Sequence, residues 1–275
     1  MSLVRSVRTK LGRVYHGASS FRSGLAFGKR FPATQLPEDP PLENGLLEQW
    51  FDDHQTGPGL WKWRHYFPVY EKHFARFVGK EVYVVEIGVF SGGSLRMWKD
   101  FFGDRVHLYG IDIRPEVVAY ADDNTQLFIG DQSDPTFWED FLRAVPEIDI
   151  IIDDGGHNAY QQIPTLEALL PHLRPGGVYL CEDVAPEHHP FHSYIDGLTR
   201  HLHTKGPVDG PEGIRTTSFQ RAIASVSVYP YVVVIEKRSE RLDHFIDEQH
   251  GTDWQPLRRP GIHSAVAPVE PGPGQ

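Results

Sequence analysis

The run Ile148-Asp149-Ile150-Ile151-Ile152-Asp153-Asp154-Gly155-Gly156-His157 decides the fold of this chain. A second apolar run, at residues 177–181, ends in Glu182-Asp183. Both runs are short, apolar and closed by acids, which is typical of buried parallel strands with polar groups at their carboxyl ends. Between them, apolar residues recur at helical spacing over residues 163–173, and Pro175-Gly176-Gly177 follows. The pattern predicts a strand–helix–strand unit whose two strands are neighbours.

Four polar residues follow these two strands and are expected to converge. The ends of neighbouring parallel strands lie about 4.8 Å apart, so Asp154 and His157 should meet Glu182 and Asp183. Three carboxylates beside one imidazole suit a hard divalent cation and a base. Acids at strand ends also commonly cap the helix that follows, and the sequence leaves that alternative open.

Composition and charge narrow the class of protein. The chain has 275 residues, of which 40% are apolar, and this is enough for one large α/β domain with extensions. Its formal charge of -10 argues against a nucleic-acid-binding surface. The one cysteine, Cys181, excludes an internal disulfide, fits the reducing cytoplasm and is expected in the core. No apolar run approaches the roughly 18 residues of a membrane span, and a homo-oligomer stays open.

The two ends of the chain differ in composition from the middle. Residues 1–36 hold seven Lys or Arg and no acid. Such a segment can be a transit peptide, an arm for an acidic or anionic lipid surface, or an extension packed on the domain. Residues 37–41 predict a linker, and the Pro-rich residues 255–275 predict a disordered tail. The expected parts are an extension with its linker at 1–58, a main domain at 59–240 and a C-terminal extension at 241–275.

A Gly-rich turn opens the main domain. The run Val82–Gly88 predicts a strand, Ser91-Gly92-Gly93 follows it, and a helix then continues through Trp98. A Gly-rich turn from strand to helix lets a ligand approach the backbone and exposes helix N–H groups. The spacing Gly88-x-x-x-Gly92 differs from the G-x-G-x-x-G of dinucleotide enzymes.

The next two predicted strands also end in polar residues. The strand over residues 106–112 ends in Asp112, where an acid can accept hydrogen bonds from ribose hydroxyls. The strand over residues 126–129 is followed by Asp131 and Gln132, whose side chains could read an adenine edge. The alternative for Asp131 is a helix N-cap or a turn residue.

Other segments are predicted from their pattern, and some keep two interpretations. Helices are expected at residues 46–51 and 61–77, and residues 222–237 predict a closing β-hairpin. The aromatic run Trp61–Phe67 can be a lid that stacks on substrate or a helix that covers the core. The histidine-rich residues 187–192 can be a second metal cluster or a solvated loop before a helix.

The motifs together resemble a known family. Five motifs of this chain resemble the successive motifs of class I S-adenosylmethionine-dependent methyltransferases. They are Glu86-x-Gly88-x-x-x-Gly92, Asp112, Gly130-Asp131-Gln132, Asp153-Asp154-Gly155-Gly156-His157 and Pro175-Gly176-Gly177. More narrowly, Asp154-x-x-His157 followed by Glu182-Asp183 resembles the metal-dependent sugar O-methyltransferases of the macrocin and mycinamicin type, which share their fold with the cephalosporin hydroxylase family. The resemblance covers roughly residues 60–237.

The resemblance implies a fold, two cofactors and a set of site residues. The implied fold is a Rossmann-like α/β sheet with helices on both faces and a C-terminal antiparallel hairpin. The implied cofactors are S-adenosylmethionine and magnesium, the metal ligands are Asp154, Glu182 and Asp183, and His157 is the general base. The expected cofactor-binding residues are Glu86, Gly88, Phe90, Ser94, Asp112, Asp131, Gln132 and Asp153. Gly156 departs from the family, where a serine is expected, and the departure removes a hydroxyl but no ligand.

The expected reaction is methylation of a sugar hydroxyl on a glycoside, glycolipid or oligosaccharide. A divalent ion lowers the pKa of a bound alcohol, two vicinal hydroxyls can chelate that ion, and a neutral imidazole can take the proton. One alternative is an NAD-dependent oxidoreductase, which the spacing from Gly88 to Gly92 disfavours. The other is a non-catalytic subunit that binds the cofactor, which the complete set of acids and His157 disfavours.

Overall fold

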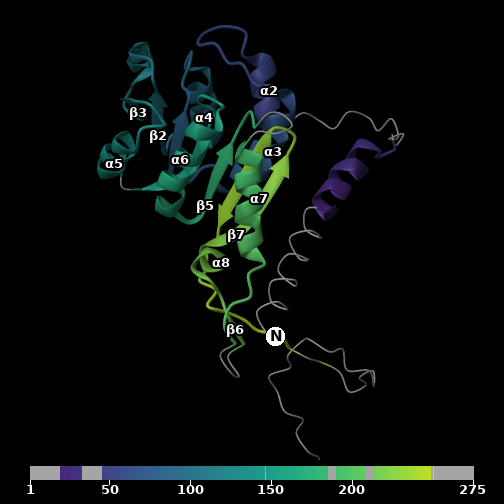
Figure 1. Ribbon diagram of the computed structural model, residues 1–275. Helices are drawn as coiled ribbons and strands as arrows, with labels where there is room; N and C mark the ends of the chain where they lie inside the picture. The colour runs from purple at the N-terminus through teal and green to yellow at the C-terminus, as the bar shows by residue number, and fades with distance from the viewer. Residues whose placement is uncertain are drawn as a thin grey trace, which may run out of the picture. The chain divides into compact units, whose positions relative to one another are not determined.

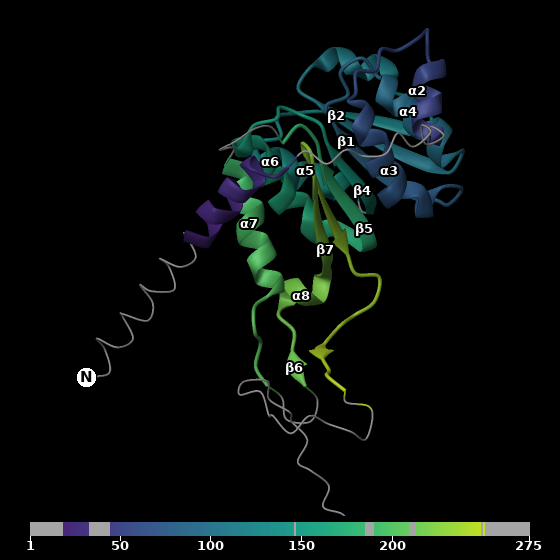
Figure 2. The same cartoon turned by 90° about the vertical axis from the view of Figure 1, so that its right-hand side faces the viewer.

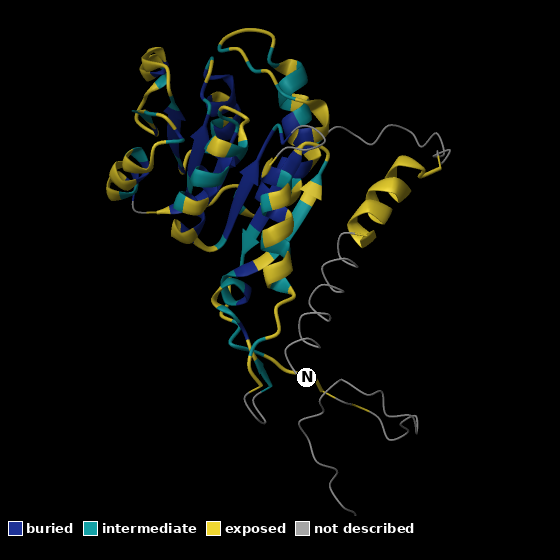
Figure 3. Ribbon diagram, viewed as in Figure 1, coloured by how far each residue is buried: buried dark blue, intermediate teal, exposed yellow. Residues whose placement is uncertain are grey.

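The computed structural model describes residues 19–32, 45–145, 147–184, 190–208, 213–248 and 250. The chain divides into two units, residues 1–43 and 44–275. In the described part of the first unit, residues 19–29 form a helix that is exposed on all sides (Figure 3). The predicted linker at 37–41, the tail at 255–275 and residues 187–189 of the histidine-rich segment lie outside the described residues. No helix in the described ranges is long and apolar enough to cross a membrane.

The second unit contains a large sheet, a small two-stranded sheet and the helices that flank them (Figure 1). The strands are β1 (Val82–Ile87), β2 (Val106–Asp112), β3 (Thr125–Ile129), β4 (Ile148–Asp153), β5 (Leu173–Cys181), β6 (Ile214–Arg215), β7 (Ile223–Tyr229), β8 (Val232–Lys237) and β9 (His244–Phe245). The α-helices are α2 (Leu46–Asp53), α3 (Phe67–Phe74), α4 (Gly93–Phe102), α5 (Pro135–Ala144), α6 (Ala159–Leu169), α7 (Pro190–Leu202) and α8 (Ser218–Ala222). Short 3-10 turns are η1 (Arg64–Tyr66), η2 (Ala75–Phe77), η3 (Pro115–Tyr120) and η4 (Leu170–His172).

The large sheet has the strand order β3-β2-β1-β4-β5-β8-β7. The first five strands pair in parallel, while β8 runs antiparallel to β5 and β7 antiparallel to β8. This arrangement confirms the predicted strand–helix–strand unit of β4, α6 and β5, and it confirms the closing hairpin. The strand order reverses between β1 and β4, and such a switch point is where open α/β sheets bind their ligands, beyond the carboxyl ends of the strands.

Helices cover both faces of the sheet (Figure 2). One face packs against α2, α3 and α4 through side chains such as Leu47, Tyr70 and Trp98. The other face packs against α5, α6 and α7 through side chains such as Phe141 and Phe191. Successive residues of the central strands alternate between these two cores, and this explains why the strands are apolar almost throughout. Helix α2 belongs to this unit although it precedes residue 59, the expected start of the main domain.

Two element boundaries differ from the sequence-based expectation. The helix expected from Trp61 begins instead at Arg64, as η1, and α3 starts beside Pro68. The Pro175-Gly176-Gly177 segment lies inside β5, where it forms an irregularity in the pairing with β4, instead of ending the preceding helix. Gly176 has a φ of +80° there, a conformation that glycine adopts without steric cost.

Gly88 allows β1 and β4 to end side by side. Its φ is +90°, and a Cβ atom built on it would lie 2.1 Å from the backbone oxygen of Asp154. The Asp154 N–H in turn donates to the carbonyl of Ile87, so the ends of both strands are held together at this glycine. A side chain at position 88 would therefore push Asp154 out of its place.

We expect Gly88→Ala to destabilise the fold more than a matched substitution at Gly79. Gly79 also has a positive φ of +71°, but its added Cβ would meet no atom within 4 Å. Both variants carry the left-handed backbone penalty of about 1–2 kcal/mol, and Gly88→Ala should lose a further ~1–3 kcal/mol from overpacking. Denaturant unfolding measures the difference, and equal losses at the two positions would show that the contact with Asp154 is not restrictive.

Candidate active site

A cavity of about 610 Å³ lies over the carboxyl ends of the parallel strands. Most of the residues predicted to form the site line this cavity. Those residues are Gly88, Phe90, Ser94, Asp112, Asp131, Gln132, Asp154, His157, Glu182 and Asp183. The same cavity is also lined by Lys62 and its two tryptophan neighbours, which come from the segment that precedes η1. The strand ends and this segment therefore form one site.

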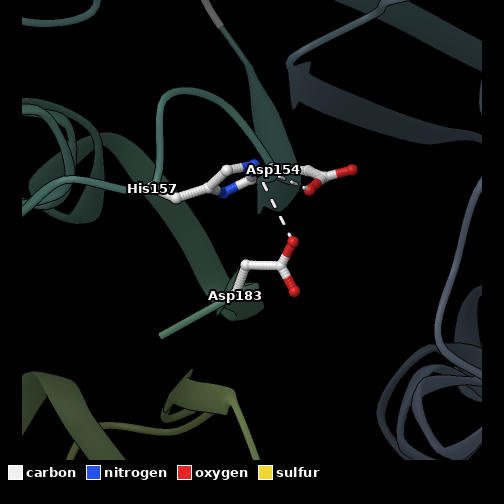
Figure 4. A group of neighbouring side chains, drawn as sticks. All are labelled: Asp154, His157 and Asp183. Atoms are coloured by element: carbon white, nitrogen blue, oxygen red, sulfur yellow. Dashed lines mark ion pairs between the residues drawn. The ribbon is translucent and has the colours of Figure 1, made fainter. Parts of the chain in front are cut away.

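Asp154, His157 and Asp183 form a cluster at one end of the cavity (Figure 4). Each offers one ligand atom, and these atoms lie within 4.8 Å of one another. The Nε2 atom of His157 is 4.0 Å from Oδ1 of Asp154 and 3.8 Å from Oδ2 of Asp183. Helix α6 has Asn158 as its N-cap, so Asp154 does not cap it. Carboxylate oxygens and an imidazole nitrogen at this separation can bind a divalent cation.

The backbone of this cluster adopts strained conformations. Among the described residues, the non-glycine positions with positive φ are Phe90, His157, Asp183 and Tyr231. Phe90, His157 and Asp183 line the cavity, and the carbonyl of Tyr231 accepts a hydrogen bond from the Val184 N–H immediately after Asp183. Backbone strain of this kind costs about 1–3 kcal/mol per residue and collects at functional sites.

Asp183 is held in place by Tyr66. The buried hydroxyl of Tyr66 donates to Oδ1 of Asp183 at 2.5 Å. The other oxygen, Oδ2, faces His157. Burial of the Tyr66 ring and its bond to Asp183 raise the pKa of this hydroxyl, which therefore stays protonated as a donor. One carboxylate oxygen is thus fixed, and the second remains directed at the cluster.

Lys62 places its ammonium between two of the predicted metal ligands. Its Nζ atom lies 2.5 Å from Oδ2 of Asp154 and 2.8 Å from Oε2 of Glu182, and its side chain is only 3% exposed. Burial opposes the charge of Lys62, but the nearby carboxylates of Asp154, Glu182 and Glu86 outweigh burial and raise its pKa above the ordinary value. The side chain is therefore a cation at every physiological pH.

Glu182 is the most deeply buried acid of the site. Burial and the charge of Asp154 raise the pKa of Glu182 to about 8, although Lys62 opposes the shift. Its Oε2 atom binds Lys62, whereas its buried Oε1 atom makes no close hydrogen bond and has the buried Tyr70 hydroxyl as its neighbour. A buried carboxylate is costly unless a cation or hydrogen bonds balance it, so a cation bound beside Glu182 would be stabilising.

Glu86 and Asp153 do not line the cavity, although both were expected to bind cofactor. The Glu86 carboxylate is buried under Lys62 and accepts hydrogen bonds from Ser94 Oγ at 2.9 Å and Trp98 Nε1 at 3.1 Å. Burial raises the pKa of Glu86 to about 7, with Lys62 opposing the shift. The Asp153 side chain points to the opposite core, where it accepts from Tyr179 Oη at 3.0 Å.

Gln132 connects Asp153 to the turn that carries His157. Its Nε2 donates to Asp153 Oδ1 at 3.0 Å, and its Oε1 accepts from the Gly156 N–H at 2.7 Å. A Cβ atom at Gly155 would lie 2.0 Å from Oε1 of Gln132, so only glycine allows this contact. The Gln132 amide is therefore engaged in holding the turn, and its side chain is only 5% exposed.

Asp112 and Asp131 line the cavity from the ends of β2 and β3. Asp112 accepts hydrogen bonds from the backbone N–H groups of Phe90 and Arg114, at 3.0 and 2.9 Å. Asp131 accepts from the backbone and hydroxyl of Ser133 through Oδ1, as expected of a turn residue. A carboxylate can accept about four hydrogen bonds, so both acids keep acceptor capacity toward a ligand.

The two parts of the aromatic run Trp61–Phe67 fit different interpretations of the sequence, a surface that stacks on substrate and a helix that covers the core. Trp61 and Trp63 line the cavity and are 88% and 56% exposed. Tyr66 and Phe67 are fully buried in the core. The Trp63 ring lies 6.2 Å from that of Tyr231, which belongs to the turn between β7 and β8. The first part of the run therefore forms an aromatic rim, and the second part covers the sheet.

Lys62 and Tyr66 were not predicted as site residues from the sequence. The available signal was a lone basic residue between two tryptophans, Trp61-Lys62-Trp63. That signal does not show that the ammonium reaches strand ends 92 and 120 residues further along the chain. His192 was weighed as a metal ligand, but it lies in α7 and does not line the cavity. Cys181 is buried in β5, as predicted.

Comparisons with known proteins agree on the type of domain. Residues 85–184 match a family model described as a methyltransferase domain. The chain is 35% identical over 201 residues to the 8-demethyl-8-alpha-L-rhamnosyl tetracenomycin-C 2'-O-methyltransferase of Streptomyces olivaceus, covering 66% of this chain and 53% of that protein. It is 40% identical over 132 residues to the demethylmacrocin O-methyltransferase of Streptomyces fradiae, covering 45% of this chain and 33% of that protein.

A solved structure has the same fold. The MycE methyltransferase of the mycinamycin biosynthetic pathway, in complex with Mg, SAH and mycinamycin VI, superposes with a TM-score of 0.59 at 29% identity. The match covers 71% of this chain and 54% of that one. The chain thus spans about half the length of these two relatives, the Streptomyces olivaceus enzyme and MycE. The comparisons confirm the predicted fold class and the predicted kind of domain.

Proposed function

Because this chain carries a methyltransferase domain of the class I type, we propose that it transfers a methyl group from S-adenosylmethionine to a sugar hydroxyl. The main support for the proposal is one continuous cavity, which is lined both by the Gly88 turn and by the acidic cluster at Asp154. The name of the Streptomyces olivaceus relative gives a rhamnosyl tetracenomycin as its substrate, and this supports a glycoside as the acceptor here.

The proposed cofactor lies across the ends of β1, β2 and β3. The Gly88 turn and the N-terminus of α4 offer close approach to the backbone, and Asp112 offers acceptors to the ribose hydroxyls. Asp131 lines the same cavity and would accept a hydrogen bond from the adenine amino group. Methyl transfer is an in-line displacement, so holding the sulfonium and the acceptor in line is a large part of the catalysis.

The proposed magnesium ligands are Asp154, Glu182 and Asp183. These residues fit the metal chemically, because they offer only hard carboxylate oxygens and because ligand atoms of Asp154 and Asp183 lie within 4.8 Å of each other and of His157. When bound, magnesium would supply a Lewis acid that lowers the pKa of the acceptor hydroxyl. Tyr66 restricts Asp183 through its hydrogen bond, so this ligand is partly positioned in advance.

His157 is the proposed general base. It is 41% exposed at the cavity, next to Asp154 and Asp183, and the Gln132 amide holds the turn on which it sits. An imidazole at this position can take a proton from the acceptor hydroxyl. The exposed rings of Trp61 and Trp63 form a surface on which a sugar or an apolar aglycone can stack.

The proposed function predicts methyl transfer that depends on a divalent cation. Labelled S-adenosylmethionine should methylate at least one member of a panel of deoxysugar glycosides in the presence of magnesium. EDTA should abolish the transfer and added magnesium should restore it, because the carboxylates require a cation to bind and acidify the hydroxyl. Undiminished transfer after thorough chelation would contradict the metal part of the proposal. Cofactor binding by calorimetry tests the remainder, since it should not need metal.

We expect His157→Ala to lose about 10²–10⁴-fold in turnover while it keeps its affinity for cofactor and metal. The pH–rate profile of the variant should lack an ionisation that the unsubstituted enzyme shows. His201→Ala is the matched control, because His201 is an exposed residue of α7 outside the cavity. If saturating magnesium returns His157→Ala to near full activity, His157 orients a ligand and does not act as the base.

A further inference from the structure

Lys62 is built into the acidic site as a permanent part of it. Its side chain is almost fully buried, and its ammonium bridges Asp154 and Glu182. A buried ammonium is rare unless acids pair with it, and the two pairing acids here come from the ends of two adjacent strands. Trp61 and Trp63 on either side of it are exposed, so Lys62 alone of the three turns inward.

The segment that carries Lys62 is fixed at both ends. The carbonyl of Gly59 accepts from the N–H of Gly93 in the first turn of α4, and a Cβ atom at Gly93 would lie 2.3 Å from that carbonyl. On the other side, the Tyr66 N–H donates to the carbonyl of Trp63 and starts η1. The backbone therefore fixes where the Lys62 side chain starts, while the bonds of its four-carbon chain can still rotate.

The Lys62 ammonium holds one oxygen of each of two carboxylates that are proposed as metal ligands. Magnesium binds carboxylate oxygens at about 2.0–2.1 Å, whereas the ammonium holds Oδ2 of Asp154 and Oε2 of Glu182 at 2.5 and 2.8 Å. A divalent ion and an ammonium on the same two carboxylates would repel each other strongly in a site of low dielectric constant. The charge of each cation therefore opposes the binding of the other.

The arrangement of the acids shows why the site needs a cation when the metal is absent. The carboxylates of Glu86, Asp154 and Glu182 lie around the ammonium, and both glutamates are buried. Without a positive charge these carboxylates would repel one another. Lys62 supplies that charge from within the chain.

We propose that Lys62 is a tethered competitor of the divalent cation: it neutralises Asp154 and Glu182 while the metal is absent and must swing away when the metal binds. The proposal rests on the proposed function, because it assumes the same metal ligands. It adds that the protein limits its own metal affinity. A further consequence is that the displaced ammonium enters the cavity beside Trp61 and Trp63.

The first test measures metal affinity in the full chain by calorimetry with manganese and with magnesium. Lys62→Met should bind either metal about tenfold more tightly or better, because an opposing charge has been removed from the ligand oxygens. Arg114→Met is the matched control: Arg114 also places a cation at the cavity, and its replacement should change the affinity much less. Equal or weaker metal binding by Lys62→Met would overturn the proposal, because Lys62 would then support the site.

Thermal unfolding provides a readout that is independent of activity. Lys62→Met should melt at a lower temperature than the unsubstituted chain without metal, because buried acids lose their partner. Added magnesium should restore most of that loss. Lys62→Gln, which keeps a hydrogen-bond donor, serves if Lys62→Met does not fold. A loss of stability that metal does not restore in either variant would show that Lys62 has a structural role only.

A second test uses the unsubstituted protein. Brief amine labelling read by mass spectrometry should modify Lys62 little without metal and clearly more with saturating manganese. Unchanged labelling would contradict displacement. Failure of the proposed function looks different: methyl transfer would then proceed without metal, whatever the variants show. If only Lys62→Met binds metal, Lys62 is never displaced in the unsubstituted chain, and this result overturns both the displacement and the proposed use of magnesium.

Discussion

The balance of charge at the carboxyl ends of β4 and β5 is the constraint on which the site depends. Several carboxylates are held there with little water, and Glu182 is 1% exposed. Such a group is tolerated only beside a cation or as a neutral acid. The ammonium of Lys62 supplies the cation, and so the segment before η1 is part of the catalytic domain although it precedes the first strand. Tyr66 contributes in the same way through its hydrogen bond to Asp183.

Close packing at two glycines and strained backbone conformations hold these charged groups in position. Gly88 lets β1 lie against Asp154, and Gly155 lets the Gln132 side chain lie close to the turn that carries His157. His157 and Asp183 both have positive φ, which a surrounding rigid structure must impose. The strain falls on the residues proposed to react with or bind the ligand, while the two apolar cores on either side of the sheet supply the stability that tolerates it.

Much of this arrangement could be predicted from the sequence, because apolar runs identify buried strands and the carboxyl ends of neighbouring parallel strands lie together. The apolar runs at 82–88 and 148–153 predicted parallel strands, and adjacency of β4 and β5 brought Asp154, His157 and Asp183 together. The positions of Glu86 and Asp153 were not predictable in the same way. Both lie on strands whose alternate residues face opposite cores, and which face holds them depends on partners distant in the chain, such as Trp98 for Glu86. Lys62 was missed for the same reason, since its contacts span 92 and 120 residues.

Anomalous diffraction from crystals grown with manganese and S-adenosylhomocysteine can show whether the strand ends form the proposed divalent-cation site and whether Lys62 leaves it. We expect one strong manganese peak bound by Asp154, Glu182 and Asp183, with the Lys62 ammonium moved away from both of its present partners. A Lys62 that still bridges Asp154 and Glu182 at saturating manganese, with no metal peak on these carboxylates, would refute both proposals.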